Sequence, residues 1–327
     1  FENVTLKLKE DKRQFEKVNG KLEFTKQNIQ INNFSLLVNA SDLSISGRMS
    51  NVFNYLYNEE VLGIDARLKA SKILITDLGS TSKEQKKMQQ KTFALPKNIK
   101  GKLMVDIQNL NYEKHDYENV KGSLSIQGRD LNFKQISLDN SGSKIKGSLR
   151  IKETEPERFD MMIRGKSNAI KIQTAFLEWD NFYQDVLLAE NISGDAALEL
   201  SFHGIFDLQT GLEYPSIDSR MVLGISNGNI RNAGIMNDIA KSVKDSPAKY
   251  ILGKKNLNLL EERLKNVAFE SLTNTITIKT SLVTIPKMEI SSSVLDMNVS
   301  GTHSFDNVID YRFDFKFRDL IASEKNS

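Results

Sequence analysis

Histidines, serines and acidic residues are the side chains that could carry catalysis in this chain, and their spacing assembles no familiar active site. The three histidines, His115, His203 and His303, lie far apart, and none has a partner at metal-ligand spacing. No Gly-x-Ser-x-Gly turn presents a serine nucleophile, and no obvious carboxylate pair marks acid–base chemistry. We therefore expect the histidines at surface or turn positions, and neither an enzyme nor a metal or cofactor site.

Phosphate and nucleic-acid binding are not indicated either. Residues 226–229 (Ser-Asn-Gly-Asn) are typical of a turn, and no Gly-x-x-x-x-Gly-Lys-Ser/Thr loop occurs. The 45 basic and 42 acidic residues leave a net charge of +3, without the basic stripe that a nucleic-acid binder needs. We interpret the lysine-rich stretch from Lys83 to Lys91 as a solvated linker in preference to an anionic-surface contact. The absence of cysteine fits an oxidising compartment.

The elements that would position any site are β-strands. Apolar and polar residues alternate with period two through most of the chain, as at Leu43-Ile45, Ile64-Ala66-Leu68 and Leu103-Val105-Ile107. This alternation predicts strands with one face in water. Asn, Asp, Ser and Gly separate the runs at short intervals, which favours antiparallel connections. Only five prolines occur, and proline cannot donate a ladder hydrogen bond, so their scarcity also favours long sheets.

Three segments depart from this alternation. Helical spacing predicts helices near 170–188, 233–244 and 257–265, the second with Ile235, Ile239 and Val243 on one stripe. We expect an N-terminal repetitive β-sheet segment at 1–165, with a flexible loop at about 79–96. A β region that carries the helices is expected at 166–327.

A repeat gives the strongest signal in the sequence. Residues 29–47 and 283–301 share two apolar residues two apart, a three-residue step, two more apolar residues and a strand ending in glycine. A third copy spans 131–147. The three-residue step falls at 32–33, 134–135 and 286–287, where it breaks the strand's parity. We favour a β-bulge at each step. A tight turn is the rival interpretation, to which Pro286 is poorly suited.

Such units stack on their neighbours, which suggests an array. The predicted fold is therefore mostly β. It is an elongated, twisted antiparallel sheet curled into a groove, with a few short amphipathic helices that cover or cap it. A long twisted sheet must curl, so its apolar inner face becomes a trough that something has to fill.

The residues also resemble a known family. Residues 98–112, 119–126 and 131–151 are similar to the repeats of AsmA-like proteins. Residues 221–231, the predicted helix at 235–243 and the strands at 267–270, 285–301 and 311–317 are similar to the family's C-terminal region. The resemblance covers most of the chain, from about residue 20 to 320.

This resemblance implies a repeating β-groove protein of the bridge-like lipid transfer superfamily, in the envelope of a Gram-negative (diderm) bacterium. It implies a periplasmic portion anchored in the inner membrane by a helix outside this chain, since Phe1 is not a natural start and no apolar run here is long enough to span a bilayer. The expected ligand is a phospholipid or another acyl-chain lipid, with inner- and outer-membrane proteins as further partners and no nucleic acid.

Two functions follow as hypotheses. The first is non-enzymatic binding or conduction of phospholipid along an apolar β-groove between the two membranes. The second is a structural or assembly factor for outer-membrane proteins, which acts through protein–protein contacts at sheet edges by β-augmentation. An ordinary core sealed by the helices is the competing interpretation of the apolar stripe. The residues predicted to line the groove are Leu198, Leu200, Ile276, Ile278, Ile285, Ile290, Met297, Val299, Phe313 and Phe315.

Overall fold

The computed structural model describes residues 1–7, 13–78, 94–183, 187–294, 296–306 and 308–315. Strands hold 64% of the residues and helices 18%, and the 17 strands belong to one sheet that does not close on itself. The prediction of a mostly β fold with a few short helices is confirmed. The chain divides into two compact units, and each is described by itself. The first unit comprises Phe1–Asn140, Lys144–Gly165 and His203–Glu213, and the second comprises Ser141–Ser143, Lys166–Phe202 and Tyr214–Ser327.

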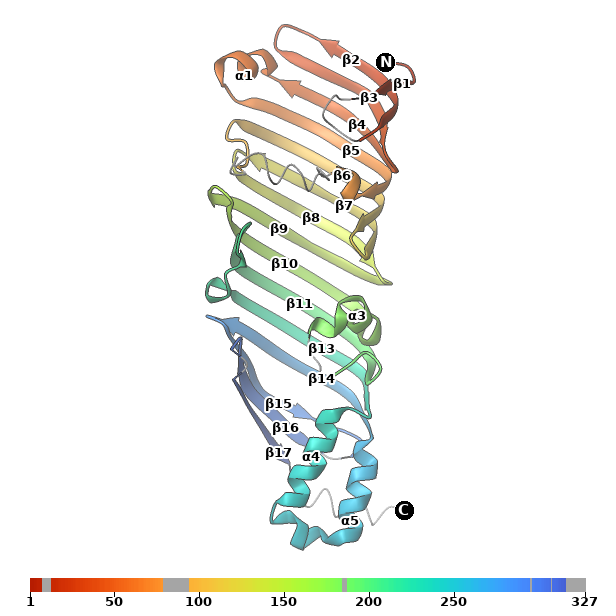
Figure 1. Ribbon diagram of the computed structural model, residues 1–327, viewed down its shortest axis with the longest axis vertical. Helices are drawn as coiled ribbons and strands as arrows, with labels where there is room; N and C mark the ends of the chain where they lie inside the picture. The colour runs from red at the N-terminus through yellow and green to blue at the C-terminus, as the bar shows by residue number, and fades with distance from the viewer. Residues whose placement is uncertain (8–12, 79–93, 184–186, 295, 307, 316–327) are drawn as a thin grey trace. The chain divides into compact units, whose positions relative to one another are not determined.

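The first unit is built from long strands and two short helices (Figure 1). Strand β10 begins in the first unit and ends in the second, whereas β11 begins in the second unit and ends in the first. The elements are β1 (Val4–Leu6), β2 (Phe15–Phe24), β3 (Asn28–Val38), β4 (Ser41–Ser50), α1 (Val52–Asn58), β5 (Leu62–Leu74), α2 (Ile75–Leu78), β6 (Ile99–Tyr112), β7 (His115–Gln127), β8 (Asp130–Asn140), β9 (Ser143–Glu155), β10 (Arg158–Lys171), β11 (Ile192–Asp207) and β12 (Gly211–Leu212).

One strand pair in this unit differs from the antiparallel pairing that the sequence predicts. Strands β5 and β6 are parallel, with Leu62 opposite Ile99 and Leu74 opposite Asn111. A parallel pair requires the chain to return to the edge where the first strand began. The connection that makes this return contains the segment predicted as a flexible loop at 79–96. Most of that segment, residues 79–93, lies outside the described residues.

The three predicted bulges are present, and the rival tight turns are excluded because β3, β8 and β15 (Leu282–Ile290) run through them. In β3, Ile31 pairs with Gly47 and Phe34 pairs with Ile45, so two residues face one on β4. Strand β8 has the same irregularity, because its Lys134 pairs with Ser123 of β7 and its Ser137 pairs with Lys121 of β7.

In β15 the third bulge falls between Ile285 and Met288. The extra residue of each bulge keeps the apolar residues before and after it on one face.

The second unit adds helices to its strands. Strand β14 pairs with β13 along its whole length, and β15, β16 and β17 form a ladder of their own. The remaining elements are α3 (Ile172–Glu178), the 3₁₀ helices η2 (Asp180–Tyr183) and η3 (Tyr214–Ser216), β13 (Asp218–Arg231), α4 (Gly234–Asp245), α5 (Ala248–Leu264), β14 (Asn266–Lys279), β16 (Met297–Ser304) and β17 (Ile309–Phe315).

The predicted helices differ in how closely they match the structure. Helix α4 agrees with the predicted 233–244, because Met236, Ile239, Ala240 and Val243 form one buried stripe at helical spacing. Helix α5 is longer than the predicted 257–265 and is kinked at Gly253, where φ is 69°. The predicted helix at 170–188 is only α3 followed by η2, and residues 184–186 lie outside the described part. Helix α1 was not predicted.

Candidate functional site

Strand pairing in the first unit assembles apolar side chains into rows that cross the strands. The central row passes from Ile31 to Phe133, each member paired with the next on the neighbouring strand. A second row runs from Ile29 on β3 to Leu131 on β8, and a third runs from Phe34 to Gly122. The central row consists of Ile31, Gly47, Ala66, Leu103, Leu124 and Phe133. We call these three rows of β3–β8 the open apolar face.

The opposite face of the same strands is mostly polar. A row displaced by one residue along each strand contains only polar or charged side chains, because successive residues of a strand point to opposite faces. Its members are Gln30, Arg48, Asp65, Lys102, Ser125 and Asn132. The sheet is therefore amphipathic, and the bulge at Asn33, where φ is 48°, preserves this separation within β3.

Burial distinguishes an uncovered face from a sealed core. A residue in a sealed core is almost fully removed from solvent, yet every member of the central row is only half-buried. Buried side chains gather instead at one end of the strands, where Ala70, Ile73 and Ile107 pack together with Leu78 of α2. Helix α2 thus seals the end of this surface and leaves the three rows open.

A carboxylate fixes the boundary between the sealed end and the open apolar face. Asp42 of β4 accepts hydrogen bonds from the backbone N–H groups of Ser71 at 3.0 Å and Lys72 at 2.6 Å, just past the last β4–β5 ladder pair. Burial raises the pKa of Asp42, but these hydrogen bonds together lower it by more. The pKa of Asp42 therefore lies below its ordinary value.

In the second unit, some of the predicted groove residues lie on a comparable apolar face. Ile276 pairs with Met221, and Ile278 pairs with Val283 on the next strand. Leu198 and Leu200 follow Ala196 at two-residue spacing, and Ala196 packs in one cluster with Leu223 and Ile225 of β13. These predicted residues are half-buried, as is Ile285.

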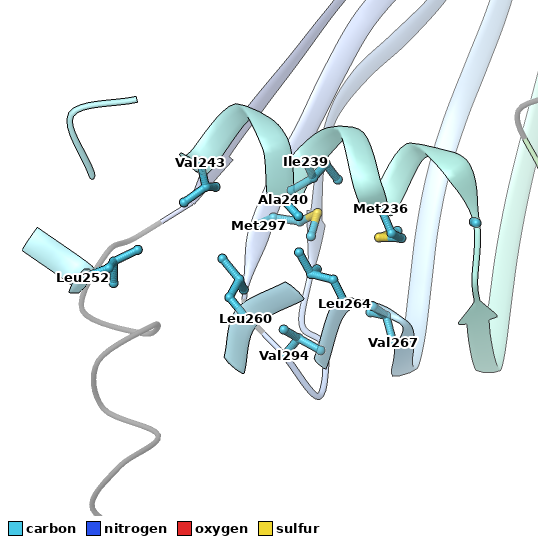
Figure 2. Close-up of a cluster of buried hydrophobic side chains, with 11 residues drawn as sticks. Met236, Ile239, Ala240, Val243, Leu252, Leu260, Leu264, Val267, Val294 and Met297 are labelled. Carbon is cyan, nitrogen blue, oxygen red and sulfur yellow. The ribbon is translucent and has the colours of Figure 1, made fainter. Parts of the chain in front are cut away.

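The other predicted residues lie against the helices. Met297 is only 7% exposed and belongs to the buried cluster formed by α4 and α5, while Ile290, Val299 and Phe313 pack against that cluster. Figure 2 shows Met297 facing Ala240 and Ile239 of α4. The side chain of Phe315 lies outside the described residues. The apolar stripe therefore has two parts, an open one on β11–β15 and one that α4 and α5 cover.

Strands β14 and β15 separate where these two parts meet. They pair only at Thr277–Lys279 and Leu282–Thr284, next to their connecting turn. Farther along, an isolated bridge joins Phe269 to Ser292. Between these points the buried Asn274 of β14 donates its side-chain amide to the carbonyl of Pro286 at 3.2 Å. The separation lets β15–β17 tilt onto the helices, as Figure 1 shows.

The histidines do not form a site. His115 is buried and is therefore not a surface residue, but it lies at the start of β7 directly after the turn at 113–114, which is one of the two expected positions. His203 contacts the carboxylate of Asp160 at 3.1 Å within β10–β11, and His303 lies 3.5 Å from the hydroxyl of Tyr311. Within the described ranges, no group of three or more His, Cys, Asp or Glu residues could hold a metal ion.

Sequence reasoning missed the open apolar face of the first unit as a candidate site. The signal was available, because its strands show the same alternation and the same repeat as the C-terminal strands. A row across strands, however, depends on register, and register cannot be read from alternation alone.

Comparison of the chain with known protein families, curated proteins and solved structures finds no match. The resemblance to AsmA-like proteins is therefore a similarity of pattern. In the part of the chain that the structure describes, no helix is long and apolar enough to cross a membrane.

Proposed function

We propose that this protein is a non-enzymatic periplasmic protein of the bacterial envelope that binds or conducts phospholipid along apolar β-sheet faces between the inner and outer membranes. A segment outside this chain would anchor it in the inner membrane. The observation that carries the proposal is the open apolar face, an amphipathic sheet surface whose apolar side stays half-exposed.

The dimensions of the open apolar face suit an acyl chain. Neighbouring strands lie about 4.8 Å apart, so the row from β3 to β8 extends about 24 Å. One leaflet of a bilayer's hydrocarbon core is about 15 Å thick, which approximates the depth of one tail. Burial of a methylene contributes about 0.8 kcal/mol, so half burial of a 16-carbon tail contributes about 6 kcal/mol.

The composition of the row supports movement along it. No charged or polar side chain interrupts the row from Ile31 to Phe133. The hydrophobic gain is non-directional and roughly proportional to contact area, so a tail gains similar energy at successive positions. A charged headgroup can meanwhile remain in water at the margin of the sheet.

The test is lipid extraction from protein purified without detergent, followed by mass spectrometry and by transfer of a fluorescent phospholipid between vesicles. Leu103→Asp places a charge in the central row, and Lys102→Asp places the same charge one residue away on the polar face. We expect wild type and Lys102→Asp to carry lipid and Leu103→Asp to lose most of it, with unchanged circular dichroism. Lipid-free wild-type protein, or equal lipid in the two variants, refutes the proposal.

In the second unit, Ile276→Asp and Thr277→Asp form the corresponding pair. Ile276 is half-buried on the apolar face and Thr277 points to the other side of β14. Val299 is unsuitable for this test because it packs against the helical cluster, and a charge there would also destabilise the fold.

One observation favours the second candidate function, an assembly factor that acts by β-augmentation. The ladder between β14 and β15 stops after three residue pairs, which leaves strand backbone next to the gap for an added strand. In this case we expect capture of an extended client peptide by lipid-free protein and no phospholipid transfer.

A further inference from the structure

The first part of α5 exposes apolar side chains to an unusual degree. Tyr250 is 82% exposed and Ile251 is 65% exposed, although both lie within a helical segment of the second unit. Their neighbour Leu252 is buried in the α4–α5 cluster. Since Leu252 anchors this turn, Tyr250 and Ile251 are held facing outward.

Lysines lie close to this exposed pair in the sequence. Lys249, Lys254 and Lys255 lie beside it, and no Asp or Glu occurs from Ser246 to Leu260. The Lys249 ammonium lies 5.2 Å from the centroid of the Tyr250 ring, within reach of a cation–π contact. We call Lys249–Lys255 the α5 tip.

The acidic residues farther along α5 are matched by other lysines. Glu261 pairs with Lys244 of α4, and Glu262 pairs with Lys265 at 2.6 Å. The hydrogen bond from Lys244 lowers the pKa of Glu261, which keeps this pair ionised. Neither of these two ion pairs involves a lysine of the α5 tip.

A kink in the backbone lies within the α5 tip. Gly253 has φ 69° and ψ 164°, and this kink interrupts the helix between Leu252 and the turns that carry Leu260 and Leu264 into the cluster. Lys249, Tyr250 and Ile251 therefore lie before the kink, and Lys254 and Lys255 lie after it.

A second exposed apolar group has the opposite electrostatic setting. Leu56 and Tyr57 of α1 in the first unit are also exposed, but Glu59 and Glu60 follow them after a single residue, Asn58. Acidic neighbours repel an anionic surface, so α1 supplies a natural contrast to the α5 tip.

We infer that the α5 tip binds the headgroup layer of an anionic phospholipid bilayer. Tyrosine and aliphatic side chains flanked by lysine suit the membrane interface, where the rings and methyl groups enter the headgroup boundary and the ammonium groups meet lipid phosphates. This inference extends the proposed function, since a lipid-carrying sheet needs a contact with a bilayer. Its test does not depend on lipid carriage.

The experiment is flotation of the full chain with vesicles of pure phosphatidylcholine and with vesicles that contain about a third phosphatidylglycerol. Each lysine near an anionic surface is worth about 1 kcal/mol, or about fivefold in affinity. We expect Lys249→Gln, Lys254→Gln and Lys255→Gln combined to weaken binding about 100-fold. Raising the salt from 0.15 M to 1 M shortens the Debye length from about 8 Å to about 3 Å and should weaken wild-type binding as well.

Matched controls separate the tip from general charge and apolarity. Gln substitutions at the exposed strand lysines Lys69, Lys72 and Lys102 remove the same charge, and Leu56→Ser with Tyr57→Ser removes the α1 group. Both controls should bind as wild type does, whereas Tyr250→Ser with Ile251→Ser should weaken binding at least tenfold. Circular dichroism and the melting temperature show whether each variant is folded.

The inference is overturned if wild type binds neither vesicle, if it binds both equally, or if the tip variants bind as tightly as the controls. Leu103→Asp should still bind anionic vesicles, so failure of lipid carriage and failure of docking are distinguishable. If the protein binds anionic vesicles but carries no lipid, the inference about the α5 tip is supported and the proposed lipid carriage is not.

Discussion

A glycine on the strand beside a bulge offers the sharpest test of the fold. Gly47 of β4 lies opposite Ile31, and its φ is 149°. A Cβ atom there would lie 2.6 Å from the Cα of Ala66 and closer still to the carbonyl oxygen of Asp65. Both groups are backbone atoms of the paired strand β5, so no rotamer change relieves the overlap.

The expected loss of stability in Gly47→Ala has two sources, the steric overlap of the added Cβ atom and the unfavourable φ of this residue. Overpacking costs about 1–3 kcal/mol, and a residue held in an unfavourable backbone region costs about 1–3 kcal/mol more. We expect Gly47→Ala to destabilise the first unit by about 4 kcal/mol. About 2–4 °C are lost per kcal/mol in a unit of this size, so its melting temperature should fall by about 10 °C.

Gly165→Ala is the matched control, because no atom lies within 4 Å of the Cβ it would add. It should change stability by less than about 1 kcal/mol, since it mainly restricts the unfolded chain. Urea denaturation followed by circular dichroism, together with calorimetry, measures both variants. Equal unfolding midpoints for Gly47→Ala and Gly165→Ala would refute the view that the bulged sheet requires glycine at this position.

Two further predictions concern packing and pH. Leu264→Ala should lower the free energy of unfolding in urea by about 3 kcal/mol, because Leu264 is 2% exposed in the α4–α5 cluster. Leu259→Ala, on the exposed side of the same helix, should lower it by less than about 1 kcal/mol. Similar losses in the two variants would contradict the assignment of Leu264 to a buried cluster. Asp42→Asn should destabilise the protein at pH 7, because it weakens the hydrogen bonds from Ser71 and Lys72. The Asp42 contribution is fully present above its unfolded pKa of about 3.8 and is lost as the pH falls through the lower folded pKa, so the gap between wild type and variant should narrow below pH 4. An unchanged gap at pH 3 would contradict this assignment.

The sequence by itself determined the local features. Period-two alternation defines strands whatever their partners are, and a three-residue step can keep one face only through an extra residue, so the bulges at Asn33, Gln135 and Pro286 were predictable. Helix α4 was predictable for a similar reason, because Met236, Ile239, Ala240 and Val243 recur at helical spacing.

The tertiary structure decided everything that depends on partners distant in sequence. Alternation does not state which strand lies beside which, so the parallel pairing of β5 with β6 and the apolar row from Ile31 to Phe133 emerge only from register. The tertiary structure also divided the stripe of predicted groove residues, which looks uniform in the sequence, into two parts. Ile276 lies on the open part while Met297 is buried by α4 and α5, because the separation of β14 from β15 carries the later strands onto the helices.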